Sequence, residues 1–146
     1  MKEYIRELMK EGLDYEEIVD TVMEYAMEKE MEYGYEDLSK DEMISYMIGM
    51  LFIEVNQGGF DQYFLKTSAK YVIRTVEFLD LIGEERVPMI LEEAYSIYKA
   101  VIPDDLKVEE YKKIDHKFYQ LETAEMKGFY DRFVEYFISN KTEELT

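Results

Sequence analysis

An uncharged apolar stretch, Met43–Ile53, constrains the fold of this chain more than any other feature. It is bounded by Glu42 and Glu54, and no charged residue lies between them. A segment that is apolar on every side must be surrounded by other parts of the chain. We therefore predict a buried central helix over about residues 40–55. Gly49 within this helix would cost about 1 kcal/mol of helix stability, so we expect another helix to cross closely there.

A sharp corner, residues 54–64, directly follows this helix. Asn56 and Gly58 adopt positive φ at low cost, so they can end a helix and reverse the chain. We expect the side chains of Glu54, Asn56 and Gln62 to satisfy amides that are left open where helices end. The corner is interpreted as a buried structural element and not as an active site.

Helical periodicity predicts the remaining elements. Ser39 with Glu42, and Asp14 with Glu17, have the spacing of capping boxes, and Thr67 or Ser68 can cap a later helix. The predicted helices cover residues 2–11, 14–31, 40–55, 69–82, 84–100 and 125–139, with a helical turn at 60–65 and no firm assignment for 106–124. No run has the period of a strand. The sequence thus predicts an all-α fold of about six to eight helices in one compact domain, with acidic N-terminal helices (1–38), a core (39–139) and a tail (140–146).

Residue types that most catalytic sites require are scarce. The chain has no Cys and a single histidine, His116, so thiol chemistry, Cys-based zinc sites and a Ser-His-Asp triad lack their parts. No Glu-x-x-His pair or phosphate-binding glycine loop occurs. We expect no enzyme activity, no cofactor and no metal. The alternative is a small-molecule or general-base site centred on Glu54, the one acid expected near the core.

The charge is strongly negative and uneven. There are 34 acids and 17 bases, giving a net charge of −17, and residues 1–50 alone contain 15 acids and five bases. Such a surface repels nucleic acid and anionic membranes and attracts basic proteins. The N-terminus has no apolar signal segment, and the stretch 43–53 is too short to cross a bilayer. We expect a cytoplasmic protein that binds a basic protein, with no direct binding to nucleic acid or membrane.

An acidic stripe on the second predicted helix is the candidate partner-binding surface. Its members, with two acids that follow it, are Glu17, Asp20, Glu24, Glu28, Glu32, Asp37 and Asp41. Like charges four residues apart cost a few tenths of a kcal/mol each, so local stability does not explain the stripe. The alternatives are a merely solubilising face or a metal site, although the loop that calcium favours is missing.

The stripe alone is a sparse imitation of DNA. One strand of B-DNA carries a charge every ~3.4 Å of axis, whereas four residues of helix rise ~6 Å. A second acidic row is therefore needed. It could come from Glu3, Glu7 and Glu11, from Glu36, Asp37, Asp41 and Glu42, or from a second copy of the chain.

The corner also carries a family resemblance. Its sequence, EVNQGGFDQYF, resembles the signature of the acidic DNA-mimic protein family, and LIG at 81–83 and IDHKFY at 114–119 match two later elements of that signature. Gln57 departs from it, since many members have a second Asn there. The resemblance covers roughly residues 38–139. The signature residues, which we expect to be structural, are Glu54, Asn56, Gly58, Gly59, Phe60, Gln62, Tyr63, Gly83, Asp115, Phe118 and Tyr119.

The resemblance implies a helical, acidic and often dimeric protein. In the characterised example of this family, surface carboxylates imitate DNA phosphates and occupy the DNA-binding face of a transcription factor. We therefore expect a non-enzymatic interaction protein whose partner is a basic DNA-binding regulator. An immunity or antitoxin-like protein that neutralises a basic toxin is the alternative binder, and the sequence does not separate the two.

Overall fold

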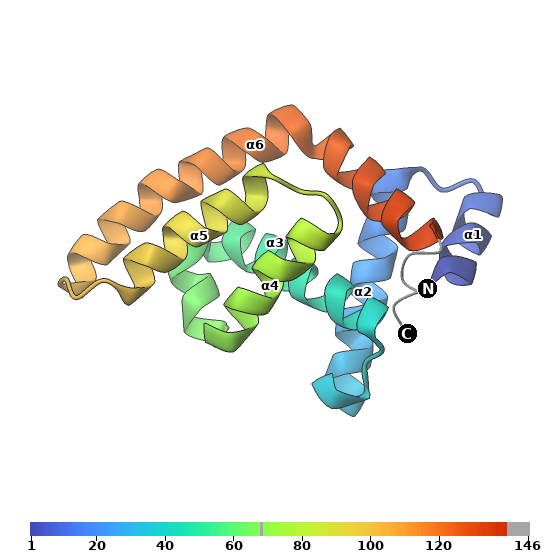
Figure 1. Ribbon diagram of the computed structural model, residues 1–146, viewed down its shortest axis with the longest axis horizontal. Helices are drawn as coiled ribbons and strands as arrows, with labels where there is room; N and C mark the ends of the chain where they lie inside the picture. The colour runs from blue at the N-terminus through green and yellow to red at the C-terminus, as the bar shows by residue number, and fades with distance from the viewer. Residues whose placement is uncertain (68, 140–146) are drawn as a thin grey trace. The chain divides into compact units, whose positions relative to one another are not determined.

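The computed structural model describes residues 1–67 and 69–139, and all regular secondary structure in that part is helical (Figure 1). Its elements are α1 (Lys2–Lys10), α2 (Tyr15–Tyr33), the 3₁₀ helix η1 (Tyr35–Asp37), α3 (Lys40–Lys66), α4 (Ala69–Leu81), α5 (Arg86–Lys99) and α6 (Asp104–Ile138). No strand occurs in these described residues, and the predicted all-α fold class is confirmed. The expected cap at Ser68 and the expected tail, 140–146, lie outside them.

Contacts group the chain into two compact units. The N-terminal unit contains Met1–Gly49 and the described residues from Lys127 onward, and the middle unit contains Met50–Met126. Helices α3 and α6 contribute residues to both units. None of the helices in the described ranges combines the length and the apolar character needed to cross a bilayer.

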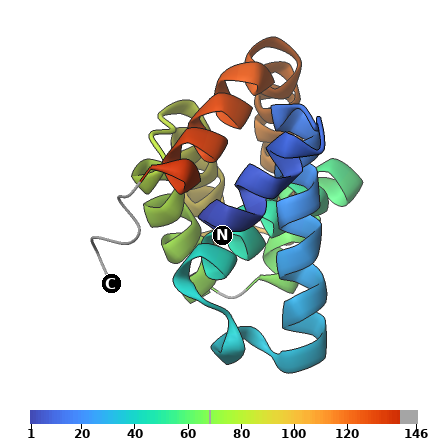
Figure 2. The same cartoon turned by 90° about the vertical axis from the view of Figure 1, so that its right-hand side faces the viewer.

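In the N-terminal unit, α1 and α2 form a helical hairpin in which α1 runs obliquely to α2 (Figure 2). The predicted capping box begins α2: Oδ1 of Asp14 accepts from the amide of Glu17 at 2.9 Å, and Oε1 of Glu17 accepts from the amide of Asp14 at 3.1 Å. This pairing satisfies two amide donors that the first turn would otherwise leave open. The buried apolar side chains of the hairpin are Ile5, Leu8, Ile18, Val19, Val22, Met23 and Ala26.

The expected close crossing at Gly49 is confirmed. A Cβ placed on Gly49 would lie 3.3 Å from the Cβ of Met23 on α2. Contacts that short are rare, so a side chain at position 49 would hold the two helices apart. The first half of α3 is buried here through Ile44, Met47 and Ile48.

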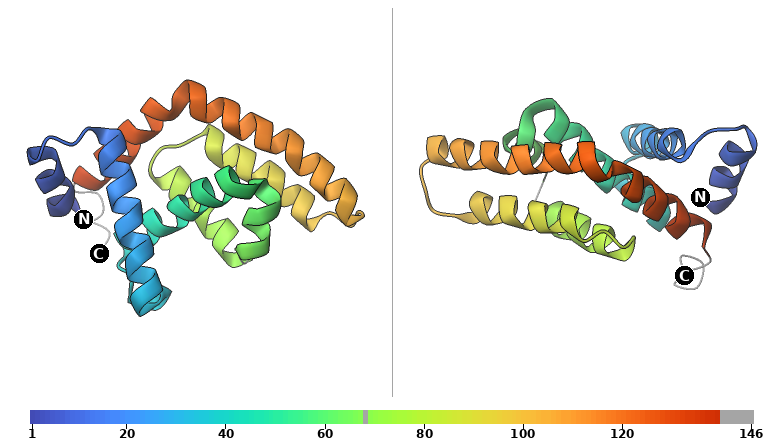
Figure 3. Two further views of the ribbon diagram at one scale, coloured as in Figure 1. Left: turned by 180° about the vertical axis from the view of Figure 1, so that it is seen from behind. Right: turned by 90° about the horizontal axis from the view of Figure 1, so that it is seen from above.

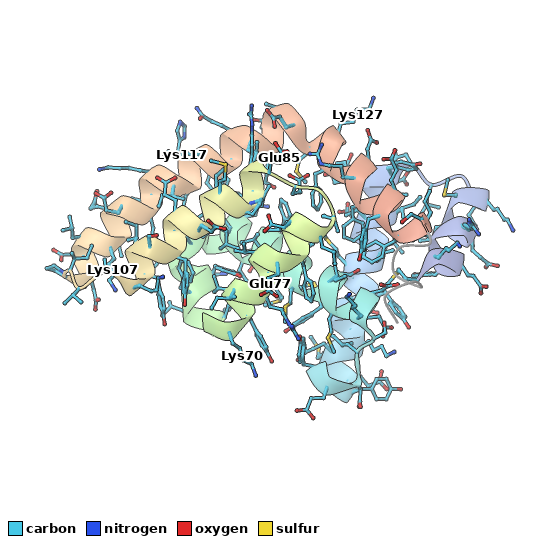
Figure 4. All side chains as sticks on the ribbon, in the orientation of Figure 1. Lys70, Glu77, Glu85, Lys107, Lys117 and Lys127 are labelled. Carbon is cyan, nitrogen blue, oxygen red and sulfur yellow. The ribbon has the colours of Figure 1, made fainter. Side chains whose placement is uncertain are left out.

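In the middle unit, α5 runs beside the part of α6 that precedes Lys127 (Figures 1 and 3). Nζ of Lys117 on α6 donates to Oε1 of Glu93 on α5 at 2.8 Å, and Nζ of Lys107 donates to the carbonyl oxygen of Tyr98 at 2.7 Å. Both lysines lie along α6 in Figure 4. Beneath these polar contacts is a core whose rings include Phe52, Phe60, Tyr63, Phe64 and Phe118.

Helix α6 differs from the sequence prediction. Residues 106–124 and the predicted helix 125–139 form one continuous helix. The hydroxyl of Thr123 donates back to the carbonyl of Tyr119 at 3.1 Å and therefore does not cap a new helix. A separate helix beginning at about Glu125 is therefore wrong, because this residue lies inside a helix that already begins at Asp104.

Candidate functional site

The predicted acidic stripe is solvent-exposed along α2. Asp20, Glu24, Glu28 and Glu32 are all exposed. Glu16 is exposed as well and extends the same four-residue interval by one turn, a member that the sequence prediction missed although the spacing indicated it. We call these five acids the α2 row.

The carboxylates of the α2 row influence one another. Partial burial raises the pKa of Asp20, and the nearby carboxylates of Glu16, Asp14 and Glu24 raise it further. A carboxyl group releases its proton less readily when like charges surround it. The row is therefore a region of concentrated negative potential.

The other predicted members of the surface have different environments. Glu17 is exposed, but one of its carboxylate oxygens belongs to the capping box with Asp14. Asp37 is exposed in η1. Asp41 is half-buried in the first turn of α3, close enough to Tyr136 that its charge adds to the effect of burial in raising the pKa of that phenol. Asp41 thus differs from the exposed acids on α2.

Glu42 does not contribute to a second acidic row, contrary to one of our expectations. Its side chain is buried, and both of its carboxylate oxygens accept from Nζ of Lys29 at 2.9 Å. Oε1 also accepts from the amide of Ser39 at 2.8 Å. Burial would raise the pKa of Glu42, but these bonds outweigh it and lower the pKa below its ordinary value. The carboxylate therefore ties α2 to the start of α3.

Helix α1 and the residue that ends it supply the second exposed row, through Glu3, Glu7 and the C-cap residue Glu11. The pKa of Tyr4 on the same helix is raised by burial, then by Tyr25, and then by the charges of Glu11, Glu24 and Glu28. Carboxylates from α1 and α2 thus act on one tyrosine. The two acidic rows come close to each other at this point of the hairpin.

The corner in the middle unit breaks the helical geometry at two glycines. Gly58 has φ −149° and ψ 16°, and Gly59 has φ 73° and ψ −175°. The helix resumes at Phe60, whose amide donates to Oδ1 of Asp115 on α6 at 2.8 Å. A Cβ on Gly59 would lie 2.3 Å from Oδ2 of Asp115. Asp115 therefore caps the resumed helix at close range, and only glycine fits beside it.

Side chains of α6 and α3 satisfy the other polar groups of the corner. The hydroxyl of Tyr119 donates to the carbonyl of Val55 at 2.8 Å, and the side-chain Nδ2 of Asn56 donates to Oε2 of Glu122 at 3.0 Å. Asp115 and Tyr119, and not Glu54, Asn56 or Gln62, bind the backbone groups of the corner.

The side chain of Glu54 is buried, and its carboxylate is bound by other side chains of the corner. Its Oε2 accepts from Nε2 of Gln62 at 2.7 Å and lies 3.5 Å from Nζ of Lys66. A general base needs a position from which it can reach a substrate proton. The bonds to Gln62 and Lys66 leave this carboxylate in a structural setting.

The remaining signature residues lie in the same unit. Tyr63 is fully buried, and that burial raises its pKa to about 12. Phe118 packs against Phe52 and Phe60 at ring-centroid distances of 5.3 and 5.8 Å. Gly83 ends α4 with φ 91°, and the amide that follows it donates to the carbonyl of Leu79 at 2.9 Å. Positive φ at this position is the conformation that a helix C-terminus uses to reverse direction.

The described residues of the two units contain no side-chain cluster that could hold a metal ion. His116 is exposed on α6, and its Nε2 lies 3.1 Å from Nε2 of Gln120. No group of three or more potential metal ligands occurs within 1–67 and 69–139. The acidic rows of the hairpin are therefore the more distinctive chemical feature.

Comparison with known proteins gives one match. The sequence model of the family described as DMP19-like protein matches residues 36–141. The matched segment contains the corner, Gly83 and the part of α6 that carries Asp115, whereas α1 and α2 precede it. No curated protein and no solved structure matches the chain.

Proposed function

Because this chain belongs to the DMP19-like protein family, we propose that it is a non-enzymatic DNA mimic that binds the basic DNA-binding face of a regulator. The match over residues 36–141 confirms the resemblance that the corner indicates. The observation that carries the proposal is the pair of exposed acidic rows on α1 and α2. These rows lie outside the matched segment, so their role rests on their own geometry.

Charge spacing supports the use of both rows. Each row places one carboxylate per four residues, or about 6 Å of helix axis. Two such rows together carry about one charge per 3 Å over the length of α1, close to the ~3.4 Å spacing of one DNA strand. A basic protein surface that neutralises DNA phosphates can pair with carboxylates at that density. We propose that a homodimer would extend this surface further.

Charge reversal on the α2 row tests the proposal. We expect Asp20→Lys, Glu24→Lys and Glu28→Lys together to abolish binding to the basic partner, since attraction becomes repulsion at the centre of the surface. The matched control carries Glu77→Lys, Asp80→Lys and Glu92→Lys, three exposed acids of α4 and α5. Each variant replaces three acids by three lysines, so the two chains have the same net charge. Far-UV circular dichroism verifies that both remain helical.

The binding assay needs an identified partner and a DNA competitor. A pull-down from the native lysate supplies the partner, and specific DNA is then titrated against the complex at two salt concentrations. We expect DNA and this protein to exclude each other, with affinity falling as salt rises. Unchanged affinity in the α2-row triple variant would refute the proposed surface. A partner that DNA does not displace would instead favour the antitoxin-like alternative.

A further inference from the structure

A cavity opens beside the two acidic rows, within the N-terminal unit. It has a volume of ≈ 370 Å³ and is lined by Met1, Tyr4, Tyr25, Ser39 and Glu42. These residues come from the beginning of α1, the middle of α2 and the beginning of α3. The volume is at the lower end of the range of about 300 to 1,000 Å³ found for small-molecule sites.

Two tyrosine rings form one wall of this cavity. The ring centroids of Tyr4 and Tyr25 are 5.4 Å apart, and the ring planes are inclined at 55°. Tyr25 is 40% exposed, so this wall is accessible to solvent. The faces of aromatic rings carry negative potential and attract cations placed over them.

Carboxylates surround the same wall. Glu11, Glu24 and Glu28 lie near enough to Tyr4 that their charges contribute to its raised pKa, after burial and Tyr25. The fourth carboxylate, Glu42, already binds the ammonium of Lys29 through both oxygens. The N-terminal ammonium of Met1 and the ammonium of Lys29 offset two of these four carboxylates, so the charge near the cavity is still net negative and favours a cation over an anion.

We infer that this cavity accepts the guanidinium group of an arginine side chain presented by the basic partner, an inference that rests on the proposed function. Arginine fits better than lysine because its planar group stacks on an aromatic face while its N–H donors bind carboxylates at the edge. The acidic rows would then attract the partner at long range, and the cavity would fix one of its side chains. Aromatic and arginine contacts of this kind often carry much of the energy of an interface.

The cavity can be tested without the partner. The full chain is labelled with 3-fluorotyrosine, and N-acetyl-arginine methylamide is titrated while ¹⁹F resonances are recorded. The resonances of Tyr4 and Tyr25, assigned from Tyr4→Phe and Tyr25→Phe, should shift with saturation in the millimolar range. The neutral analogue N-acetyl-citrulline methylamide has nearly the same shape and should cause no saturable shift. Any purification tag is placed after residue 146, because Met1 lines the cavity.

Two variants of one position separate ring chemistry from fold. Tyr25→Leu should weaken binding of the arginine probe at least tenfold, observed at Tyr4, whereas Tyr25→Phe keeps the ring and should bind nearly as well as the parent. Tyr33→Leu is the control, since Tyr33 is 59% exposed on the same helix and does not line the cavity. A probe that causes no saturable shift, or a citrulline analogue that binds equally, would overturn the inference.

The outcomes distinguish this inference from the proposed function. If the probe fails while the α2-row triple variant still abolishes partner binding, the acidic surface stands and the cavity is not an arginine site. If the probe binds as expected but partner affinity is unchanged in Tyr25→Leu, the partner does not use the cavity and the inference is refuted as stated. Loss of both probe and partner binding in Tyr25→Leu, with both kept in Tyr33→Leu, supports it.

Discussion

At the scale of single residues, the corner depends on a side chain that lies far away in the sequence. Gly59 has a positive φ that most residues avoid, and Asp115 occupies the space where a side chain would begin. The same carboxylate accepts from the amide of Phe60. Burial raises the pKa of Asp115, the hydrogen bond from Phe60 opposes this, and the charge of Asp61 adds to the increase.

We predict that Gly59→Ala lowers the free energy of unfolding by about 2 to 4 kcal/mol, through backbone strain and through contact with Asp115. Gly12→Ala is the matched control, because Gly12 also has positive φ (91°), but a Cβ placed on it would meet no atom within 4 Å. Gly12→Ala should lower the free energy of unfolding only through backbone strain, by about 1 kcal/mol. Urea unfolding followed by circular dichroism measures both, and equal losses would argue against the steric role of Asp115.

At the scale of elements, helix α3 shows how close packing overrides local preference. Gly49 weakens the helix in isolation, yet it allows α2 to approach until Met23 lies against the backbone. The neighbouring atom is a Cβ, which cannot move unless its whole helix moves. The packing of α2 on α3 therefore requires glycine at this position.

We predict that Gly49→Ala destabilises the chain by about 1 to 3 kcal/mol, because overpacking exceeds the gain in helix propensity. Gly128→Ala in α6 is the comparison. There the nearest atoms, 3.2 Å away, are at the flexible end of Arg132, so we expect a gain of up to about 1 kcal/mol. Thermal and urea unfolding measure the change in the free energy of unfolding, which should be a loss for Gly49→Ala and a gain for Gly128→Ala. A loss at Gly128 as large as that at Gly49 would contradict the argument from close crossing.

At the scale of the whole molecule, a net charge of −17 sets how stability depends on pH and salt. Burial raises the pKa of Asp20, Asp115 and Glu122, with neighbouring acids adding to the effect at the two aspartates. Groups with raised pKa in the folded chain stabilise it most below their ordinary pKa, and this contribution is lost as pH rises through the folded value. Glu42 has a lowered pKa and acts in the opposite direction.

We predict that the melting temperature rises as pH is lowered from 7 towards the ordinary carboxyl pKa of about 4, because carboxyls with raised pKa take up protons, and falls at lower pH, where Glu42 and other bonded carboxylates become protonated. Raising salt from about 0.01 M to about 1 M shortens the Debye length from about 30 Å to about 3 Å. Repulsion among exposed acids is then screened, so the gain between pH 7 and 5 should shrink. Differential scanning calorimetry measures this, and a melting temperature independent of pH at low salt would contradict it.

Local signals in the sequence were sufficient for much of the fold and for the exposure of the α2 row. Capping residues at Asp14, the uncharged stretch of α3 and the glycine at the crossing each indicate their structure within a few positions. The acidic row follows from helical spacing alone, since residues four apart share a face.

What the sequence did not reveal depends on distant partners. Nothing near Glu42 shows that Lys29 neutralises it, and nothing near Phe60 identifies Asp115 as its cap. The cavity beside Tyr4 and Tyr25 arises where three elements meet, which spacing along one helix cannot indicate.

The bonds between the corner and α6 have a consequence for the order of folding. The amide of Phe60 binds Asp115, which lies 55 positions later in the chain, and the carbonyl of Val55 binds Tyr119, which lies 64 positions later. Contacts with such long loops form slowly, since the loop entropy must be lost before the bonds are gained. A ribosome adding about 5 to 20 residues per second leaves the corner unclosed for several seconds. During synthesis the two separated parts of the family signature therefore behave as halves of one late folding step.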